Sequence, residues 1–238
     1  MNIKKNNSLL VKQISWLVIF SIAMAYLESA VVVYLREIYY PEGFSFPLTP
    51  MNADMVITEF WREIATIIML VGIGILTGTS SSQRFAFFLL TFAIWDIFYY
   101  VFLYALLGWP SSLFTWDILF LVPIPWVGPV ITPIIVSLIM IVLAFSLLRF
   151  KEKLNLKQWF LLFLGSQVVV ISWVLDYWNF SSNHYSNGVW TLSSDQELFG
   201  SSEPYIPSSF NWYIFMIGIV LLLMAITSYY ILNRKKDN

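Results

Sequence analysis

The segment VGPVITPIIVSLIMIVLAFSLL, residues 127–148, contains no charged residue and is followed at once by Arg149 and Lys151. An α-helix needs about 20 mainly apolar residues to cross the hydrocarbon core of a bilayer, which is about 30 Å thick. This segment has that length, and basic residues favour the cytoplasmic side of a membrane. It therefore predicts a membrane-spanning helix whose carboxyl end lies in the cytoplasm.

Five other segments have the same length and apolar character. They cover residues 14–34, 56–78, 85–107, 159–177 and 212–232. We expect a single membrane domain, residues 1–238, of the all-α class. The predicted fold is a polytopic membrane helix bundle with six transmembrane helices plus a short outer-side interfacial or re-entrant helix.

The composition of the whole chain agrees with this prediction. Hydrophobic residues make up 59% of the 238 residues and charged residues 11%, whereas soluble domains carry about 25% charged residues. So few charges cannot cover a surface that faces water, so we expect the lipid bilayer to be the main partner. The net charge of −1 provides no basic field for nucleic acid, and no nucleic-acid partner is expected.

The basic residues indicate the orientation of the chain. With six spans, 11 of the 13 Lys and Arg residues fall on one side, and such residues mark the cytoplasmic side. We therefore predict a multi-pass protein of the cell membrane with both termini in the cytoplasm. These residues are Lys4, Lys5, Lys12, Arg84, Arg149, Lys151, Lys153, Lys157, Arg234, Lys235 and Lys236.

The segment between the third and fourth spans is unusual. Residues 113–122 are apolar apart from Thr115 and Asp117, and as a helix of about 15 Å they are too short to cross. Prolines and a glycine follow within residues 123–129. We expect a short helix that does not cross, acting either as a surface hairpin between two spans or as the lid or lining of a cavity. Irregular backbone at membrane depth persists only where protein or water covers it.

Three carboxyl side chains, those of Glu28, Glu63 and Asp96, fall inside predicted spans. At about 1.5 Å per residue they lie about 24, 22 and 18 Å from the cytoplasmic ends of their helices, so their depths are similar. A charge near the bilayer centre costs at least about 2.5–3.5 kcal/mol, so these groups should face the bundle interior. Arg62 is the only basic residue clearly at their depth, and we expect it to contact at least one of them. At least one carboxyl group must then be protonated, hydrated in a cavity or neutralised by a bound cation.

Other polar side chains extend this candidate site. Glu59 and Thr66 share a helix face with Arg62, although a Glu59–Arg62 pair is also typical of a solvated helix start. The tyrosines that follow Asp96 could donate hydroxyl hydrogens to it. The alternative to a functional pocket is a set of hydrogen-bonded polar groups that only hold helices together. The candidate binding pocket consists of Glu28, Arg62, Glu63, Asp96, Tyr99, Tyr100, Asp117 and Asp176.

The chain lacks the residues that several kinds of chemistry require. The chain has no Cys, which excludes disulfides, thiolate metal sites and Cys nucleophiles. No Lys lies in a predicted span to form a retinal-type Schiff base, and the only His, His184, falls in a predicted external loop. We assign no catalytic residue, no metal ligand and no cofactor from the sequence.

Three short segments carry a family resemblance. They are YLREIYYP at residues 34–41, WDIFYY at residues 95–100 and PIPWVGP at residues 123–129. Together they resemble an uncharacterised group of bacterial multi-pass membrane proteins, over about the first half of the chain. The resemblance implies a multi-pass membrane fold and carries over no activity and no site residue.

Three functional hypotheses follow. The first is binding or transport of a small cation or polar solute through an outward-facing acidic and aromatic pocket. The second is a membrane-embedded enzyme that acts on a lipid or lipid-linked substrate with paired carboxylates, which with water could also hold Mg²⁺ or Mn²⁺. The third is a non-catalytic accessory subunit of a membrane complex that docks a partner through the external loop, residues 178–210.

Overall fold

The computed structural model describes residues 2–49, 51–121, 124–184 and 205–237. In this part of the chain all six long helices have the length and hydropathy needed to cross a membrane. The prediction of a multi-pass, all-α membrane bundle with six spans is therefore confirmed. The elements are α1 (Asn2–Tyr39), α2 (Ala53–Thr77), α3 (Ser81–Leu107), β1 (Trp116–Phe120), β2 (Trp126–Pro129), α4 (Ile131–Phe150), α5 (Leu156–His184) and α6 (Trp212–Asp237).

Most helices extend beyond the predicted spans, because the apolar window marks only the part that crosses hydrocarbon. Polar residues continue the helix and end it by capping. The side chain of Asn52 accepts a hydrogen bond from the Met55 amide at the start of α2, and Ser80 caps α3 through Gln83 in the same way. Side-chain oxygens at these positions satisfy amides that have no partner within the helix.

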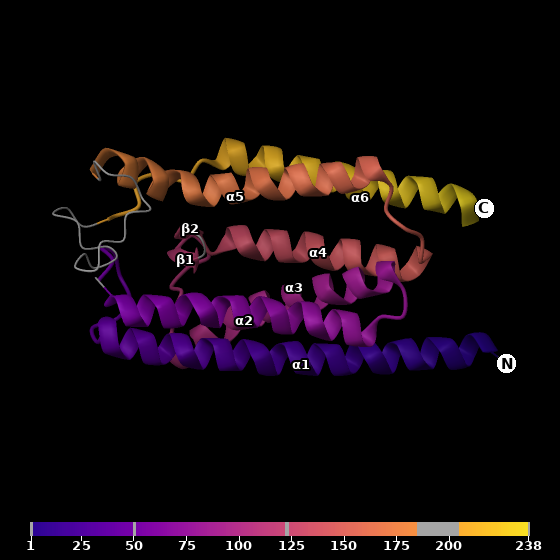
Figure 1. The fold of residues 1–238 in the computed structure, drawn as a ribbon, viewed down its shortest axis with the longest axis horizontal. Helices are drawn as coiled ribbons and strands as arrows, with labels where there is room; N and C mark the ends of the chain where they lie inside the picture. Colours follow the sequence, from indigo (N-terminus) through magenta and orange to yellow (C-terminus); the bar gives the residue numbers. More distant parts are fainter. Residues whose placement is uncertain (1, 50, 122–123, 185–204, 238) are drawn as a thin grey trace.

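The helices run side by side along the long axis of the molecule, and both termini lie at the same end (Figure 1). α3 is central, since α1, α2 and α4 all pack against it. α5 and α6 form a pair that joins the rest through α4 and the β-hairpin. The connections between α2 and α3 and between α4 and α5 lie at the end with the termini (Figure 1), so the basic residues that flank these connections gather there.

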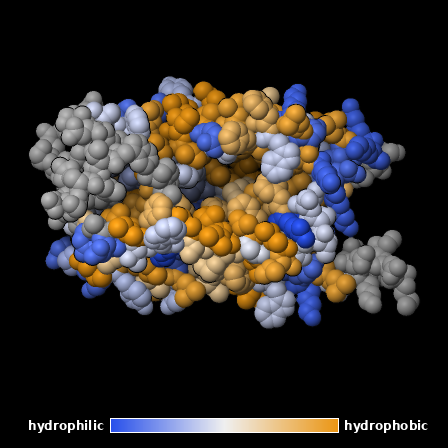
Figure 2. All heavy atoms as spheres, viewed as in Figure 1, coloured by the Kyte–Doolittle hydropathy of each residue, from blue (hydrophilic) through white to orange (hydrophobic). Residues whose placement is uncertain are grey.

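Hydrophobic side chains cover much of the middle of the surface, and hydrophilic ones gather near the end that carries the termini (Figure 2). Large apolar side chains point outward from several helices, including Trp61 and Leu76 on α2 and Phe163 on α5. In water such a surface would aggregate, whereas hydrocarbon solvates it at no cost. The bilayer is therefore the solvent of this surface.

The α5–α6 pair packs through two glycines that lie opposite each other. A Cβ atom added at Gly218 would lie 2.7 Å from Val169 Cγ2 and 2.9 Å from the Val169 amide nitrogen. A Cβ atom added at Gly165 would lie 3.0 Å from Leu222 and 3.1 Å from the Gly218 carbonyl oxygen. Small residues allow the two backbones to approach this closely, which is a common way to join helices in a membrane.

The prediction of a short helix within residues 113–122 is wrong, because Trp116–Phe120 forms the first strand of a β-hairpin. β1 pairs antiparallel with β2, with Asp117 opposite Gly128 and Trp116 opposite Pro129. Aromatic and β-branched residues favour strands, and prolines after β1 prevent a continuing helix. The hairpin also takes residues 127–129 from the predicted fourth span, which is why α4 begins only at Ile131.

The hairpin lies at the end of the molecule opposite the termini (Figure 1), and α3 and α4 meet it at that same end, so residues 108–121 and 124–130 do not cross the bundle. Its second strand packs against α5, where Trp126 stacks on Trp173 with ring centroids 5.8 Å apart. The Trp173 indole donates a hydrogen bond of 2.8 Å to Thr132 Oγ1 at the start of α4. The hairpin thus connects α5 to the α1–α3 side of the bundle.

Candidate functional site: a charged cavity beside the hairpin

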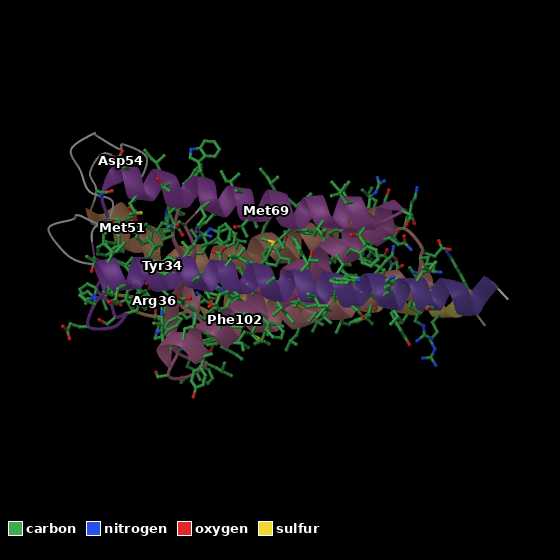
Figure 3. All side chains as sticks on the ribbon, turned by 90° about the horizontal axis from the view of Figure 1, so that it is seen from below. Tyr34, Arg36, Met51, Asp54, Met69 and Phe102 are labelled. Atoms are coloured by element: carbon green, nitrogen blue, oxygen red, sulfur yellow. The ribbon has the colours of Figure 1, made fainter. Side chains whose placement is uncertain are left out.

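A cavity of about 130 Å³ lies between the hairpin, α3 and the hairpin-side ends of α1 and α2. The chain that joins α1 to α2 also lines it through Tyr40, Phe44, Leu48, Thr49 and Met51. Figure 3 shows this end of the molecule, with Arg36 near the end of α1 and Met51 and Asp54 near the start of α2. Five carboxyl side chains and two guanidinium groups line the cavity: Glu28, Glu59, Glu63, Asp96, Asp117, Arg36 and Arg62.

Arg62 on α2 joins two of these carboxylates. Its Nε donates a hydrogen bond of 2.8 Å to Glu59 Oε2, and its Nη2 donates to the other oxygen of Glu59. Its Nη1 donates to Glu28 on α1. Thr66, one turn further along α2, donates a hydrogen bond of 3.4 Å to the second oxygen of Glu28. The planar fork of Arg suits this geometry, because it presents several donors in one plane.

Arg36 at the end of α1 lines the hairpin side of the cavity. Its Nη2 lies 3.4 Å from Asp117 Oδ1 on β1, and its guanidinium carbon lies 3.7 Å from the centre of the Trp109 ring and 4.5 Å from that of Phe44. Tyr100 donates a hydrogen bond of 3.2 Å to Asp117 Oδ2. This buried pair therefore joins α1, α3 and the hairpin, and the aromatic rings favour the guanidinium as a cation.

Burial raises the pKa of Asp117 to about 6. The Arg36 guanidinium opposes the rise, and so do the hydrogen bonds that the carboxylate accepts from Tyr100 and from the Ile118 amide. Desolvation penalises the charged form of a carboxyl group, while a nearby cation and hydrogen-bond donors favour that form. The pKa of Asp117 thus lies above that of a solvent-exposed Asp.

Glu63 and Asp96 accept hydrogen bonds from uncharged donors, whereas each of the other three carboxyl groups contacts an arginine. Both oxygens of Glu63 accept from the Leu121 amide, at 3.0 and 3.1 Å, where β1 ends. Asp96 Oδ2 accepts a hydrogen bond of 2.8 Å from Ser137 on α4. Within the part of the chain that the structure describes, neither forms an ion pair with a basic side chain. A buried carboxyl group, Glu63, and a partly buried one, Asp96, are therefore left without an ion-pair partner among the described residues.

The structure brings most of the predicted pocket residues together. Arg62 contacts Glu28, and the same cavity is also lined by Glu63, Asp96, Tyr99, Tyr100 and Asp117. One candidate, Asp176, is misplaced, because it does not line the cavity. It lies on α5 and accepts hydrogen bonds from the hydroxyls of Tyr205 and Ser208 and from the Ser208 and Ser209 amides. It lies outside the cavity because α5 packs against β2 and α6, whereas the hairpin, α1, α2 and α3 line the cavity.

Several residues that line the cavity were not among the predicted pocket residues, including the charged residues Arg36 and Glu59. Arg36 is only 7% exposed and Glu59 only 6%, whereas Arg36 was given no role and the Glu59–Arg62 pair was left open as a solvated helix start. The spacing of Glu59 and Arg62 on one helix face was the available signal. Trp95 also lines the cavity, but it carries no pattern that separates it from the other aromatic residues.

Among the described residues, no three His, Asp or Glu side chains are grouped closely enough to hold a metal ion. Mg²⁺ and Ca²⁺ need several oxygen ligands at short range, so the described site does not have the geometry of a metal centre. His184 ends α5, and its side chain lies outside the described part of the chain.

No protein-family model, no curated protein and no solved structure matches this chain. The function must therefore be argued from the site itself.

Proposed function

We propose that the cavity beside the hairpin binds a small organic cation. One observation carries the proposal: Glu63 and Asp96 line a cavity in which the two arginines already have other carboxylate partners. A buried carboxylate is stable only when a cation, hydrogen bonds or protonation compensates its charge. A ligand with a positive charge compensates it directly.

The aromatic lining favours an organic cation over a metal ion. Tyr39, Tyr40, Phe44 and the two tyrosines of α3 all line the cavity. Aromatic faces attract ammonium groups and do so most strongly in desolvated sites. Trp95 is buried, and its indole Nε1–H has no acceptor among the described residues. An amine that also carries a hydroxyl group would offer this donor an acceptor.

The size of the cavity restricts the ligand. An apolar cavity of about 150 Å³ accommodates benzene, so a cavity of about 130 Å³ fits a molecule of about five or six heavy atoms. A lipid head group with its acyl chains is far larger. This favours a small solute over the lipid substrate of the enzyme hypothesis. The accessory-subunit hypothesis depends on a loop that falls mainly in residues 185–204, outside the described part of the chain.

We further propose that residues 1–238 form one membrane domain with both termini in the cytoplasm, so that the cavity opens outward in the cell membrane. The basic residues at the end with the termini support this orientation. The absence of Cys permits a direct test with single cysteines at Ser112 and Lys151. An impermeant thiol reagent added to intact cells should label the first and spare the second, and the reverse pattern would contradict the orientation. The proposed kinship with the bacterial group described above rests on its three segments and adds no activity.

Calorimetric titration of the purified protein in detergent tests the binding. Methylammonium, tetramethylammonium and choline are compared with tert-butanol, a neutral molecule similar in shape to tetramethylammonium. At least one of the three cations should bind saturably, and tert-butanol should not. Glu63→Gln and Asp96→Asn should each weaken binding at least about tenfold, which is about 1.4 kcal/mol.

Asp176→Asn is the matched control, because it removes a carboxylate of the same half of the molecule that lies outside the cavity. Its affinity should equal that of the native protein. Failure of all three cations to bind, or unchanged binding in both cavity variants, would contradict the proposal. Flux measurements in liposomes then distinguish transport from binding alone.

A further inference from the structure

The charges that line the cavity do not balance. With every group ionised, five carboxylates and two guanidinium groups give a net charge of −3. One monovalent cation leaves two negative charges uncompensated at membrane depth, where each costs at least about 2.5–3.5 kcal/mol. Bound protons must neutralise the carboxylates that neither the arginines nor the ligand neutralises. The number of protons that the cavity binds therefore depends on whether the ligand is present.

The contacts indicate which group exchanges its proton. Glu28, Glu59 and Asp117 are each held by an arginine, which stabilises their charged forms. Glu63 accepts an amide hydrogen on both oxygens, an arrangement that also suits a carboxylate. Asp96 accepts only the Ser137 hydroxyl on Oδ2, which leaves Oδ1 without a hydrogen bond among the described residues.

Asp96 also has access to the cavity. It is partly buried, it lines the cavity, and it lies on α3, the helix at the centre of the bundle. Charged and titratable groups from every element around the cavity influence it. These are Glu28, Arg36, Tyr39 and Tyr40 on or just after α1, Glu59, Arg62 and Glu63 on α2, Tyr99 and Tyr100 on α3 and Asp117 on β1; α4 contributes the uncharged Ser137.

We infer that the cavity exchanges a proton for its cationic ligand at Asp96. In the empty cavity the Asp96 carboxyl group keeps its proton, because no cation lies beside it. When the cation enters, the O–H bond breaks, the proton passes to water, and the carboxylate pairs with the cation. When the cation leaves, Asp96 takes up a proton again, so the net charge of the cavity stays the same throughout.

This inference rests on the proposed binding of an organic cation and adds its coupling to protons. Two consequences distinguish it from simple binding. Each monovalent cation that binds should release about one proton, and affinity should rise with pH by up to about tenfold per unit while Asp96 is protonated in the empty cavity. Simple binding to a cavity that is already ionised does neither.

The experiment titrates the full-length protein with tetramethylammonium chloride, which has no proton of its own to release. Calorimetry in buffers of different ionisation enthalpy gives the number of protons released per cation bound. The native protein should release about one. Asp96→Asn should bind with little proton release and with a flat pH profile, whereas Asp176→Asn should behave as the native protein does.

Asp96→Glu keeps a carboxyl group and should retain proton release, which separates the role of the acid from a loss of folding in Asp96→Asn. Choline or methylammonium replaces tetramethylammonium if only one of those binds, with methylammonium's own ionisation subtracted. Native protein that binds a cation without releasing protons would overturn the exchange and leave the proposed binding intact. Native protein that binds none of the three cations would overturn both.

Discussion

The α5–α6 pair and the α1–α3 side of the bundle are held together by different means. In the pair, Gly165 and Gly218 bring two backbones together, and apolar side chains such as Val169 and Leu222 fill the contact. On the other side, an arginine on α2 joins Glu28 on α1, and a second arginine on α1 joins Asp117 on the hairpin. Both sides solve the same problem of joining helices in a lipid solvent.

The difference shows that this chain joins some of its helices through ion pairs and others without them. A buried ion pair often stabilises a protein no more than well-packed apolar residues do, because desolvation cancels the attraction. The α5–α6 contact demonstrates that this chain can join helices by packing alone. The charges between α1, α2 and the hairpin are therefore available for another use, and the proposed exchange of cations and protons would give them one.

Arg62→Leu should have the largest effect on stability. It removes the cation from between Glu28 and Glu59, and leaving buried charges unpaired costs about 3–5 kcal/mol. Arg36→Leu should cost less, since Arg36 has only one carboxylate partner. Thermal unfolding in detergent, followed by circular dichroism, measures both. The triple change Arg62→Leu, Glu28→Gln, Glu59→Gln should recover part of the loss, and no recovery would mean that packing by Arg62 matters more than its charge.

The bundle and the depth of its charges could be predicted because both depend on local composition. Stretches of about 20 apolar residues give the helices, and the distance of Glu28 or Asp96 from the basic end gives their depth. Which helices become neighbours depends on side-chain packing between distant segments, and no local pattern records it. Asp176 was therefore assigned to the cavity, and Arg36 was not.

The β-hairpin shows a second limit. Residues 116–120 read WDILF, a short and mainly apolar run that fits a strand as well as a helix, so periodicity cannot decide between them. The decisive contact is the hydrogen bond from the Leu121 amide to Glu63, 58 residues earlier in the chain. A carboxylate on α2 thus holds the residue that follows β1, while β2 pairs with β1 itself. The local sequence records neither contact.

Gly218→Leu tests the apolar side of the comparison and should have the next largest effect. Its new Cβ atom would lie 2.7 Å from Val169 Cγ2, so α5 and α6 must separate. Overpacking of this kind costs about 1–3 kcal/mol. Gly72→Leu is the matched control, because nothing lies within 4 Å of a Cβ atom added there. Equal melting temperatures for the two variants would show that the glycine contact does not hold the pair.

Asp117 should give the hairpin a pH-dependent stability. Its pKa rises to about 6 in the folded protein from an ordinary value of 3.8, so the folded state binds the proton more tightly than the unfolded state does. The free energy of unfolding should then fall as pH rises from about 4 to about 6, by at most about 1.4 kcal/mol per pH unit, and should not change further above that range.

Asp117→Asn should remove this part of the pH dependence, measured as the difference between native and variant unfolding curves at several pH values. Tyr100→Phe removes a hydrogen bond that lowers the pKa of Asp117, so the falling range should extend to higher pH. Identical slopes for native protein and Asp117→Asn would show that Asp117 keeps the same charge in both states over this range.

Asp176→Asn should have the smallest effect on stability, although Asp176 makes more hydrogen bonds than Asp96 does among the described residues. Its partners are the Tyr205 hydroxyl at 2.7 Å, the Ser208 hydroxyl at 2.6 Å and two amides at 3.3 Å. An Asn side chain keeps one acceptor oxygen and replaces the other by a donor, so we expect a loss of about 0.5–1.5 kcal/mol. The loss should appear in the unfolding of the segment that joins α5 to α6, while cation affinity and proton release remain native. A change in either binding property would mean that the charge of Asp176 acts on the cavity across the hairpin, and the division between the two sides of the molecule would then be less complete than their contacts indicate.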